Sequence, residues 1–574
     1  MKKIVERSVM GRVWALSDNN CDSDLLKQIL CSRGIVSDTD VQKFLDPKIK
    51  DYMPDPFVLR DMQRGVVVVA DAIVSGKKVA VFGDYDVDGI TSTAIMVKFL
   101  RACGAGVMWH LPDREGEGYG LNINAIEKFA ADGAGVLLSV DCGISGVNEV
   151  QRAKELGMDV VITDHHNPDN KIPDADAVID PKRTDDESGL NYLAGVGVAF
   201  MFLVALNREL RAREINVDLD LMDLLDLVAL GTICDTMPLI GLNRAFVATG
   251  LRILDLRKNI GLSALMRVAK VKSASVYAAG FALGPRLNAA GRLDSAAPAL
   301  ELLLTDNILI ANDLADKLNV MNAERMEIQN QIMLAATDMA NNCVSSGKKS
   351  LLLCGDDWHC GVMGIIAGRL KDKYNMPTMV ATRVDDKING SGRSTEDIDL
   401  GKIIHDALTA GILTEGGGHS VAAGFSLNSD KFNNFCEFVE SAVRTQLGDG
   451  ATEQIITADA ELDASAANMG LVNKMSALSP FGQGNPEPML ILNGGVLMYA
   501  TTMGRDGGHL RGRVRGSDGR TLDFVGFNLT QTNVGEFLMD DANVNRKIKM
   551  LGRLKENDYN GNKSVQFVLE DIAI

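Results

Sequence analysis

The sequence predicts an α/β protein: a parallel sheet, a second α/β unit joined to it by a long helix, and a C-terminal β-barrel. Three observations lead there. Short β-rich runs alternate with helical segments over residues 77–180, a helical pattern covers residues 296–342, and turn-rich, alternating sequence follows residue 450. Strands and helices that alternate in this way are typical of a parallel sheet covered on both faces. The 574 residues allow about three or four folded units at roughly 150 residues each.

The strands of the first region are expected at residues 79–82, 106–111, 136–140, 159–163 and 177–179. Their continuous apolar character fits strands that are buried on both faces. Helical segments such as TSTAIMVKFLRAC and VNEVQRAKEL lie between them. We therefore expect a covered parallel sheet in the first part of the chain, after an N-terminal extension.

The remaining elements follow in order. A proline-free helical pattern after Pro298 predicts a connector over residues 296–345. A second α/β unit is expected over 346–450, with a helix at GIIAGRL, a strand at PTMVAT and a glycine-rich stretch at 416–418. The segments HLRGRVRG and KSVQFVLEDI predict a small barrel over 451–574. The first unit then covers residues 1–295.

Composition limits the possible functions. The longest apolar stretch, residues 194–206, is shorter than the roughly 20 residues that span a bilayer. Glu6 and Arg7 stand where a signal peptide would need its apolar core, so we expect a cytoplasmic protein with no membrane contact. The net charge of −17 disfavours nucleic-acid binding by overall basicity but permits a local basic groove.

Acidic and histidine residues follow three of the predicted strands. They are Asp84, Asp86 and Asp88 after the first strand, Asp141 after the third, and Asp164, His165 and His166 after the fourth. The carboxyl ends of parallel strands meet at one edge of a sheet, so these side chains are expected to converge. Carboxylates brought together without counter-charges repel, which favours a cation site. A mixed Asp and His shell suits Mn²⁺, or Mg²⁺ if more ligands are oxygens, and Asp235 is a further candidate ligand.

Simpler interpretations exist for each motif alone. DYDVDG matches the first positions of a calcium loop, but Ile95 stands where the loop needs a bidentate Glu. An Asp/Gly turn without a ligand, or adjacent histidines in a surface turn, would also be ordinary. The joint occurrence of these motifs at three strand ends favours metal binding.

Motifs along nearly the whole chain resemble the DHH phosphoesterase superfamily. DYDVDG, SVDCG, TDHH and GTICD are similar to its first four motifs, and GGGHSVAAGF is similar to the signature of its companion DHHA1 domain. EGYGL, GPRLNAAGR, WHCGVMGIIAGRL, SGRS and FGQGNPEP resemble stretches of the RecJ family of bacterial single-strand-specific exonucleases. The resemblance implies a DHH domain, a DHHA1 domain and a C-terminal OB-fold.

The resemblance also implies a chemistry: two-metal hydrolysis of single-stranded DNA from the 5′ end to 5′-mononucleotides, in DNA repair and recombination. By position, the metal ligands would be Asp84, Asp86, Asp88, Asp141, His165 and Asp235, with Asp141 as the bridge. His166 would lie beside them near the scissile phosphate. The phosphates and the 5′ end would be held by Arg114, Arg286, Asn288, Ser391, Arg393, Gly418 and His419. For Tyr119, Phe281 and Trp358 we expect core packing rather than base stacking.

Residues 505–520 form a local basic segment, with five arginines and two aspartates. On a β-strand the alternation places Arg511, Arg513 and Arg515 on one face, as a groove that follows a DNA backbone requires. A solvated edge strand protected by charge is the alternative.

The resemblance implies three partners: single-stranded DNA, a single-strand-binding protein and a helicase. No Gly-x-x-x-x-Gly-Lys-Ser/Thr motif for ATP-driven unwinding is present in the sequence, so duplexes would have to be opened by a helicase. We expect a monomer. The main alternative function is a DHH-type phosphodiesterase of short oligonucleotides or cyclic dinucleotides, which would leave the basic strand without a role. A binding protein without catalysis is disfavoured because every expected ligand position is filled.

Overall fold

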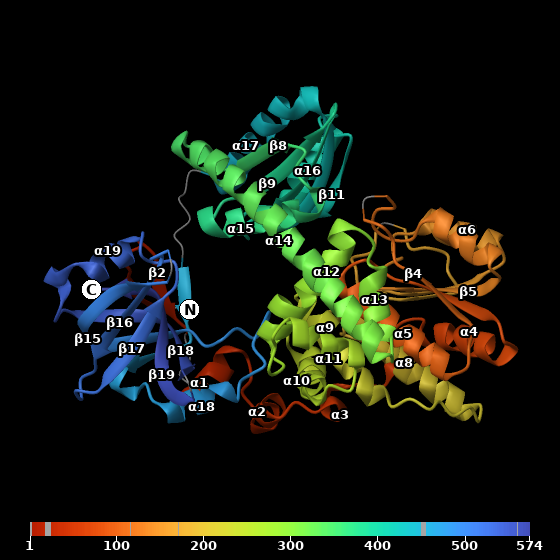
Figure 1. Cartoon of the computed structure of the whole chain (residues 1–574), viewed down its shortest axis with the longest axis horizontal. Helices are drawn as coiled ribbons and strands as arrows, with labels where there is room; N and C mark the ends of the chain where they lie inside the picture. Colours follow the sequence, from red (N-terminus) through yellow and green to blue (C-terminus); the bar gives the residue numbers. More distant parts are fainter. Residues whose placement is uncertain are drawn as a thin grey trace. The chain divides into compact units, whose positions relative to one another are not determined.

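The computed structural model describes residues 3–574 except 18–23, 115, 170, 449–454, 505 and 560. Contacts divide the chain into two compact units (Figure 1). One consists of Asp55–Asp235 and Gly250–Thr452, and the other of Met1–Pro54, Thr236–Thr249 and Glu453–Ile574. Among the described residues, no helix combines the length and apolar character that crossing a lipid bilayer requires.

The predicted parallel sheet is present in the first of these units. Its strand order is β4-β3-β5-β6-β7, and all four pairings are parallel. The strands are β3 (Lys78–Phe82), β4 (Val107–His110), β5 (Ala134–Val140), β6 (Asp159–Thr163) and β7 (Ala177–Ile179). Most side chains of β3, β5, β6 and β7 are buried because helices cover both faces, whereas those of the edge strand β4 are half-buried.

The helices around this sheet lie on two sides. One face packs against α4 (Met62–Ser75), α5 (Val87–Ala102) and α8 (Gly195–Ala212). The other packs against α6 (Ile123–Ala131) and α7 (Val147–Glu155). The carboxyl edge of the sheet stays free of these layers, so the residues that follow β3, β5 and β6 can meet there.

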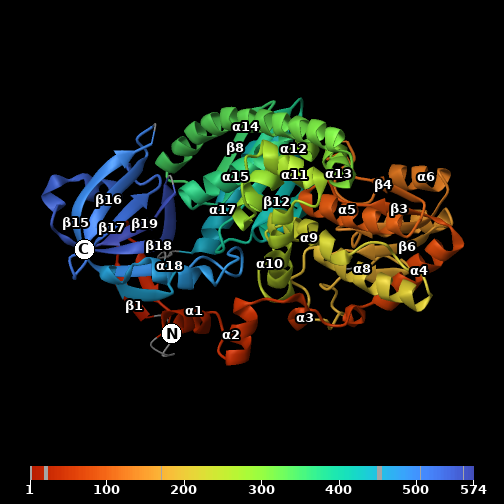
Figure 2. The same cartoon turned by 60° about the horizontal axis from the view of Figure 1, so that its bottom comes forward.

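Helical segments lead from this sheet to the second one. They are α9 (Leu225–Cys234), α10 (Gly241–Leu256), α11 (Ile260–Val268), the π-helical segment η3 (Ala278–Leu283), α12 (Gly284–Leu293), α13 (Ala297–Leu304) and α14 (Ile308–Ser345). The 38-residue α14 packs on α11, α12 and α13 at one end and on the second sheet at the other (Figure 2). It begins after Asn307, whose side chain accepts hydrogen bonds from two backbone N–H groups of the first turn.

The second α/β unit contains a mixed sheet of order β11-β12-β10-β9-β8. Its elements are β8 (Leu351–Asp356), α15 (Cys360–Tyr374), β9 (Thr378–Val384), β10 (Lys387–Arg393), α16 (Leu400–Thr409), β11 (Glu415–His419), β12 (Ala422–Asn428) and α17 (Phe432–Leu447). α14 and α15 cover one face, and α16 and α17 cover the other.

The C-terminal sequence forms the predicted barrel. It consists of β15 (Leu490–Met503), β16 (His509–Arg515), β17 (Thr521–Gly526), β18 (Lys547–Tyr559) and β19 (Asn562–Ala573). The barrel closes because β15 pairs with both β16 and β18. β14 (Ala460–Asp463) pairs with β15 in parallel at its outside.

The N-terminal residues pack with the C-terminal barrel unit. β1 (Lys3–Arg7) pairs with β2 (Val13–Leu16), which pairs in parallel with β13 (Ile455–Ala458). In addition, the fully buried Arg244 of α10 donates hydrogen bonds to the carbonyls of Phe44, Leu478, Ser479 and Pro480. Three distant parts of the chain are thus joined in one unit.

Candidate metal centre and phosphate-binding residues

The acidic and histidine residues at the strand ends do converge. Asp84 follows β3, Asp141 follows β5 and His165 follows β6, and these neighbouring parallel strands end at the same edge. Asp86 is the N-cap of α5 and accepts hydrogen bonds from the backbone N–H groups of Asp88 and Gly89 at 2.9 and 3.1 Å. The calcium-loop interpretation therefore fails, because DYDVDG connects a strand to a helix N-terminus.

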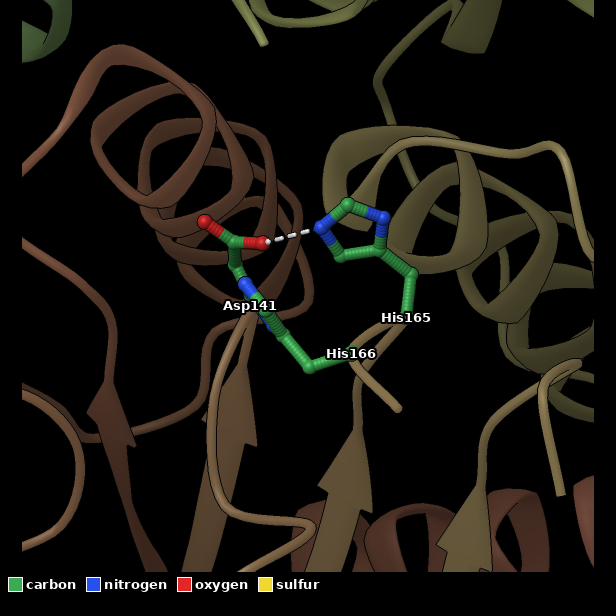
Figure 3. Close-up of side chains that lie close together, drawn as sticks. All are labelled: Asp141, His165 and His166. Atoms are coloured by element: carbon green, nitrogen blue, oxygen red, sulfur yellow. Dashed lines mark ion pairs between the residues drawn. The ribbon is translucent and has the colours of Figure 1, made fainter. Parts of the chain in front are cut away.

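His165 lies at the centre of the group. Its Nδ1 is 3.0 Å from the carbonyl oxygen of Leu193, so Nδ1 carries the proton and donates it. The other nitrogen, Nε2, lies 3.1 Å from Asp141 Oδ1 (Figure 3). It also lies 3.6 Å from Asp235 Oδ2 and 3.7 Å from Asp88 Oδ2. A bare ring nitrogen facing carboxylates is the arrangement of a metal ligand whose second nitrogen is held in place.

The backbone structure around Asp88 and Asp141 determines where these two carboxylates lie. Asp88 accepts hydrogen bonds from the N–H groups of Gly195 and Val196 at 2.7 and 2.9 Å, at the start of α8. Asp141 adopts a left-handed backbone conformation with φ of 60°. Gly195 allows the close approach of Asp141, because a Cβ atom at Gly195 would lie 2.3 Å from Asp141 Oδ1.

The residues fit a divalent-cation site. Three sets of ligand atoms each lie within 4.8 Å of one another: Asp84, Asp86 and Asp141; Asp88, His165 and Asp235; and Asp141, His165 and His166. Within the described residues, Asp84 Oδ1, Asp141 Oδ1 and His165 Nε2 are buried without a hydrogen-bond partner. Buried acceptors of this kind are costly unless a cation or a proton satisfies them. Asp141 belongs to two of the sets.

The carboxylates raise one another's pKa. Burial, and then the negative charges nearby, hold the pKa of Asp84 and of Asp141 well above the usual range. The same causes raise the pKa of Asp88 to about 7 and that of Asp235 to about 8. Burial lowers the pKa of His165 to about 3, so its ring stays neutral. A metal ion is bound by neutral imidazole and ionised carboxylates. A cation among these residues would offset the repulsion between the carboxylates and favour their ionised form.

His166 occupies a different environment beside the centre. Its Nδ1 lies 2.8 Å from Asp164 Oδ1 and 3.1 Å from the hydroxyl oxygen of Tyr119. Burial lowers its pKa, but the hydrogen bond to Asp164 outweighs burial and raises the pKa of His166 to about 9. His166 therefore carries a positive charge at neutral pH. Our sequence interpretation placed Asp164 at the strand end but did not include this buried carboxylate among the site residues.

A group of arginines lies next to the acidic cluster. Arg114 lies over the ring of Tyr85, 5.7 Å from its centroid, and Tyr85 stands between Asp84 and Asp86. Burial and the charge of Arg114 lower the pKa of Arg393. Arg114, from the loop after β4, is thus close enough to Arg393, at the end of β10, for its charge to act on it; that both bind phosphate stays a prediction.

Two further arginines join this group, and sequence reasoning missed both. Burial and the charges of Arg114 and Arg325 lower the pKa of Arg292 on α12 to about 10. Arg325 on α14 is 9% exposed, contacts the polar side chains Asn322 and Gln329, and keeps its Nε without a partner among the described residues. Arg292 is the last residue of the stretch GPRLNAAGR, which the sequence analysis includes. No motif in the sequence around Arg325 indicates that this residue joins the group.

The other predicted phosphate-binding residues fall into two places. Arg393 of β10 and His419 of β11 both pair with Ala422 of β12, which lies between these two strands. Directly paired residues point to the same face of a sheet, so Arg393 and His419 share a face, and Ser391, two residues before Arg393, points to it as well. Gly418 has a φ of 149° on the edge strand β11. Arg286 and the partly exposed Asn288 lie on α12, where Arg286 donates to Ala282 O at 2.7 Å and to Asn319 Oδ1 at 3.0 Å.

The basic strand of the barrel has the predicted alternation: Arg511 and Arg515 are exposed, Arg513 is half-buried, and Gly512 and Val514 between them are buried. β16 pairs on both sides, so the edge-strand alternative is wrong. Arg513 forms a bidentate pair with Asp523 of β17, at 2.5 and 3.1 Å. Its charge is balanced within the sheet, whereas we find no ion pair of Arg511 or Arg515 among the described residues.

The aromatic residues also differ from expectation. Trp358 packs against the core between α15 and β8, as predicted. Core packing is wrong for Tyr119 and Phe281, which are 52% and 71% exposed. Periodicity alone could not separate a buried from an exposed aromatic in these loop and helix-end positions.

Comparison with known proteins gives matches along most of the chain. The DHH family N-terminal domain matches residues 78–232, the DHHA1 domain matches 343–445 and the RecJ OB domain matches 458–571. The single-stranded-DNA-specific exonuclease RecJ of Escherichia coli is 34% identical over 564 residues, covering 96% of this chain and 95% of the relative. The protein of the same name from Bacillus subtilis is 31% identical over 578 residues, covering 100% of this chain and 71% of the relative.

Solved structures agree with this relationship. RecJ from Thermus thermophilus in complex with Mn²⁺ matches 96% of this chain and 76% of that chain, with a TM-score of 0.80 and 28% identity. The structure of the same protein with Mg²⁺ has a TM-score of 0.73 and 27% identity over 96% of this chain and 74% of that chain. The identity of 34% over nearly the full length of both chains, together with the match to the RecJ OB domain, shows that the chain belongs to the RecJ family.

Proposed function

We propose that this chain is a 5′-to-3′ exonuclease that hydrolyses single-stranded DNA to 5′-mononucleotides. The observation that carries the proposal is the convergence of buried carboxylates and the bare Nε2 of His165 at one sheet edge, next to arginines for which the described residues provide no carboxylate partner. Relatives named single-stranded-DNA-specific exonucleases supply the substrate class and support the proposal.

The metal ligands in this proposal are Asp84, Asp86, Asp88, Asp141, His165 and Asp235. They would hold two divalent ions, Mn²⁺ or Mg²⁺. Asp141 and His165 each belong to two of the three ligand sets. Asp141 is the proposed shared ligand because a carboxylate offers two oxygens, whereas His165 has only one ring nitrogen that is not already donating a hydrogen bond. Such ions lower the pKa of a shared water and neutralise charge on the attacking and leaving oxygens. Leu193 orients the ring of His165, and Gly195 and Val196 hold Asp88, so these ligands are positioned before the substrate binds.

Other residues would bind and orient the strand. His166, kept protonated by Asp164, would donate a hydrogen bond to the scissile phosphate. Arg114, Ser391, Arg393, Gly418 and His419, with Arg286 and Asn288, would hold backbone phosphates and the 5′ end. Arg511, Arg513 and Arg515 would contact the strand farther along. Guanidinium groups suit this task because their donors match the geometry of phosphate oxygens.

We also propose a domain organisation for the chain and the proteins with which it acts. We propose boundaries at residues 295, 345 and 450 between a DHH domain, a helical connector, a DHHA1 domain and an OB-fold domain. The protein would act as a cytoplasmic monomer in DNA repair and recombination, with a single-strand-binding protein and a helicase. The chain contains no Gly-x-x-x-x-Gly-Lys-Ser/Thr motif, so duplex would have to be opened by that helicase.

A time course on end-labelled strands tests the proposal. A long single strand, labelled at either end, is incubated with Mg²⁺, with Mn²⁺ or with a chelator, and a dinucleotide is run in parallel. Release of mononucleotides from the 5′ end, with metal only, is the expected result. Cleavage of the dinucleotide alone would favour a phosphodiesterase of short oligonucleotides, and turnover in chelator would contradict the metal assignment.

A further inference from the structure

Tyr277 and Phe281 form an exposed aromatic pair. Their rings stack with centroids 5.1 Å apart and an interplanar angle of 23°. They are 73% and 71% exposed, which is unusual for rings of this size in water. Each ring covers part of one face of the other, so the two uncovered faces lie on opposite sides of the pair, and each can stack with a further ring. An exposed pair of this kind can receive a flat, apolar ligand.

The helical segment that carries the pair packs against the end of α9, directly before the candidate metal ligand Asp235. Phe281 belongs to the π-helical segment η3, and π-helical insertions are frequent at functional sites. The inner side of η3 packs against the end of α9: the Cys234 thiol donates to Ala279 O at 3.7 Å. A Cβ atom at Gly284 would lie 2.4 Å from Cys234 Sγ, so this packing is tight. Asp235 follows Cys234 directly.

A cation lies next to the pair on the same helical segment. Arg286 donates to the carbonyl of Ala282, the residue that follows Phe281. It also donates a hydrogen bond to the amide oxygen of Asn319, and in the described part of the chain its charge has no carboxylate partner. An aromatic face beside an unpaired guanidinium matches one nucleotide unit, which has a flat base and an anionic phosphate.

We propose that Tyr277 and Phe281 form a stacking platform for the nucleobases of the bound single strand, beside the phosphate that Arg286 contacts. The inference rests on the proposed function and adds a binding site to it. Stacking suits an enzyme that must accept any sequence, because every base has an aromatic face while its hydrogen-bonding edge differs. Loss of either ring should weaken strand binding about tenfold.

The test measures base stacking directly. The fluorescent base analogue 2-aminopurine, which is quenched by stacking, is placed at successive positions of a long oligodeoxynucleotide. Binding is followed with the full chain carrying Asp141→Ala, so that the strand is not cut. We expect added quenching at one or two positions, and loss of that quenching with Tyr277→Ala or Phe281→Ala.

Matched variants separate stacking from general apolar contact. Phe281→Leu keeps most of the apolar area but not the ring, so it should lose the quenching, whereas Phe281→Trp should keep it. Leu334→Ala on α14 removes a side chain that is also 73% exposed and should change nothing. Because the two rings are exposed, their alanine variants should unfold at the temperature of the parent protein.

A double-mutant cycle provides the decisive result. An abasic nucleotide at the quenched position should weaken binding as much as Phe281→Ala, and the two changes together should cost no more than either alone. Unchanged quenching and affinity in both alanine variants would overturn the proposal and would indicate a protein-binding surface instead. Failure of the wild-type chain to cut single strands, with position-specific quenching retained, would overturn the exonuclease proposal and leave the platform standing.

Discussion

Oδ1 of Asp141 lies 3.1 Å from Nε2 of His165, and both atoms are buried without a hydrogen-bond partner among the described residues. The ring of His165 is neutral and carries its one proton on Nδ1, which donates a hydrogen bond to Leu193 O. Nε2 therefore has no proton to donate to Asp141. The pair therefore leaves two acceptors facing each other, an arrangement that a cation between them would stabilise.

Asp141→Ala should lower the rate of strand cleavage by more than about 100-fold, because it removes the carboxylate that we propose is shared by two metal ions. DNA binding should persist, since the arginines that we propose hold phosphate remain. Cleavage kinetics and an equilibrium binding titration measure the two effects. Asp159→Ala is the matched control: it removes a carboxylate whose pairing with Lys77 is a surface ion pair, worth less than about 1 kcal/mol. Mn²⁺-dependent turnover by Asp141→Ala at the parental rate would contradict the bridging role.

Gly195→Ala should impair the metal centre without removing any ligand. Its new methyl group would lie 2.3 Å from Asp141 Oδ1, so Asp141 must move. We expect the increase in melting temperature caused by Mn²⁺ to shrink, since a ligand that binds the folded state stabilises it in proportion to its affinity. The control is Gly508→Ala, where a Cβ would meet nothing within 4 Å. An undiminished Mn²⁺ effect in Gly195→Ala would show that Asp141 does not bind the ion in this position.

The arginines of β16 should contribute unequally to DNA binding. Arg511→Ala and Arg515→Ala should each reduce the slope of log affinity against log salt by about 0.7, the value for one phosphate contact on a single strand. Arg513→Ala should have a smaller effect, because Asp523 already balances its charge. Affinity for a long strand, titrated at several salt concentrations, gives the slopes. Equal slopes for all three variants and the parent would show that β16 is not part of the DNA-binding surface.

Asp226 should make the protein less stable as the pH rises. This carboxyl is buried on α9, away from the metal centre, and burial raises its pKa to about 7. The folded state therefore binds this proton more tightly than the unfolded state, and its contribution to stability is lost between about pH 4 and pH 7.

Asp226→Asn should be more stable than the parent at pH 8, by up to about 4 kcal/mol for a shift of roughly three pKa units. The two proteins should differ little at pH 4. Urea unfolding at several pH values, without metal, measures the difference. A difference in the free energy of unfolding that stays constant from pH 4 to pH 8 would show that Asp226 titrates normally.

Much of the fold was predictable from local sequence. The five strands of the parallel sheet lie where apolar runs predicted them, and the barrel follows the alternating sequence after residue 450. The convergence of Asp84, Asp141 and His165 was predictable too, because parallel strands that are hydrogen-bonded neighbours must end at one edge. The end of α9 was not predicted: the helix continues to Cys234, so that Asp235 is its C-cap residue.

Pairings between distant residues were not predictable in this way. Nothing in the sequence near Arg513 shows that Asp523 will balance it, and nothing near Arg325 shows that burial will leave its Nε without a partner. The N-terminal strand β2 pairs with β13, hundreds of residues later, although both are too short to carry a distinctive pattern. The choice among such pairings depends on the packing of the whole chain.

The amino-acid sequence by itself determined the order of strands and helices and the chemical groups at the ends of the strands, because hydrophobic period and capping act over a few residues. Tertiary structure alone decided which nitrogen of His165 faces the carboxylates, which arginines keep an unbalanced charge, and that Tyr277 and Phe281 remain in solvent. These properties depend on which groups approach within a few ångströms after folding, and short-range sequence patterns carry no information about that approach.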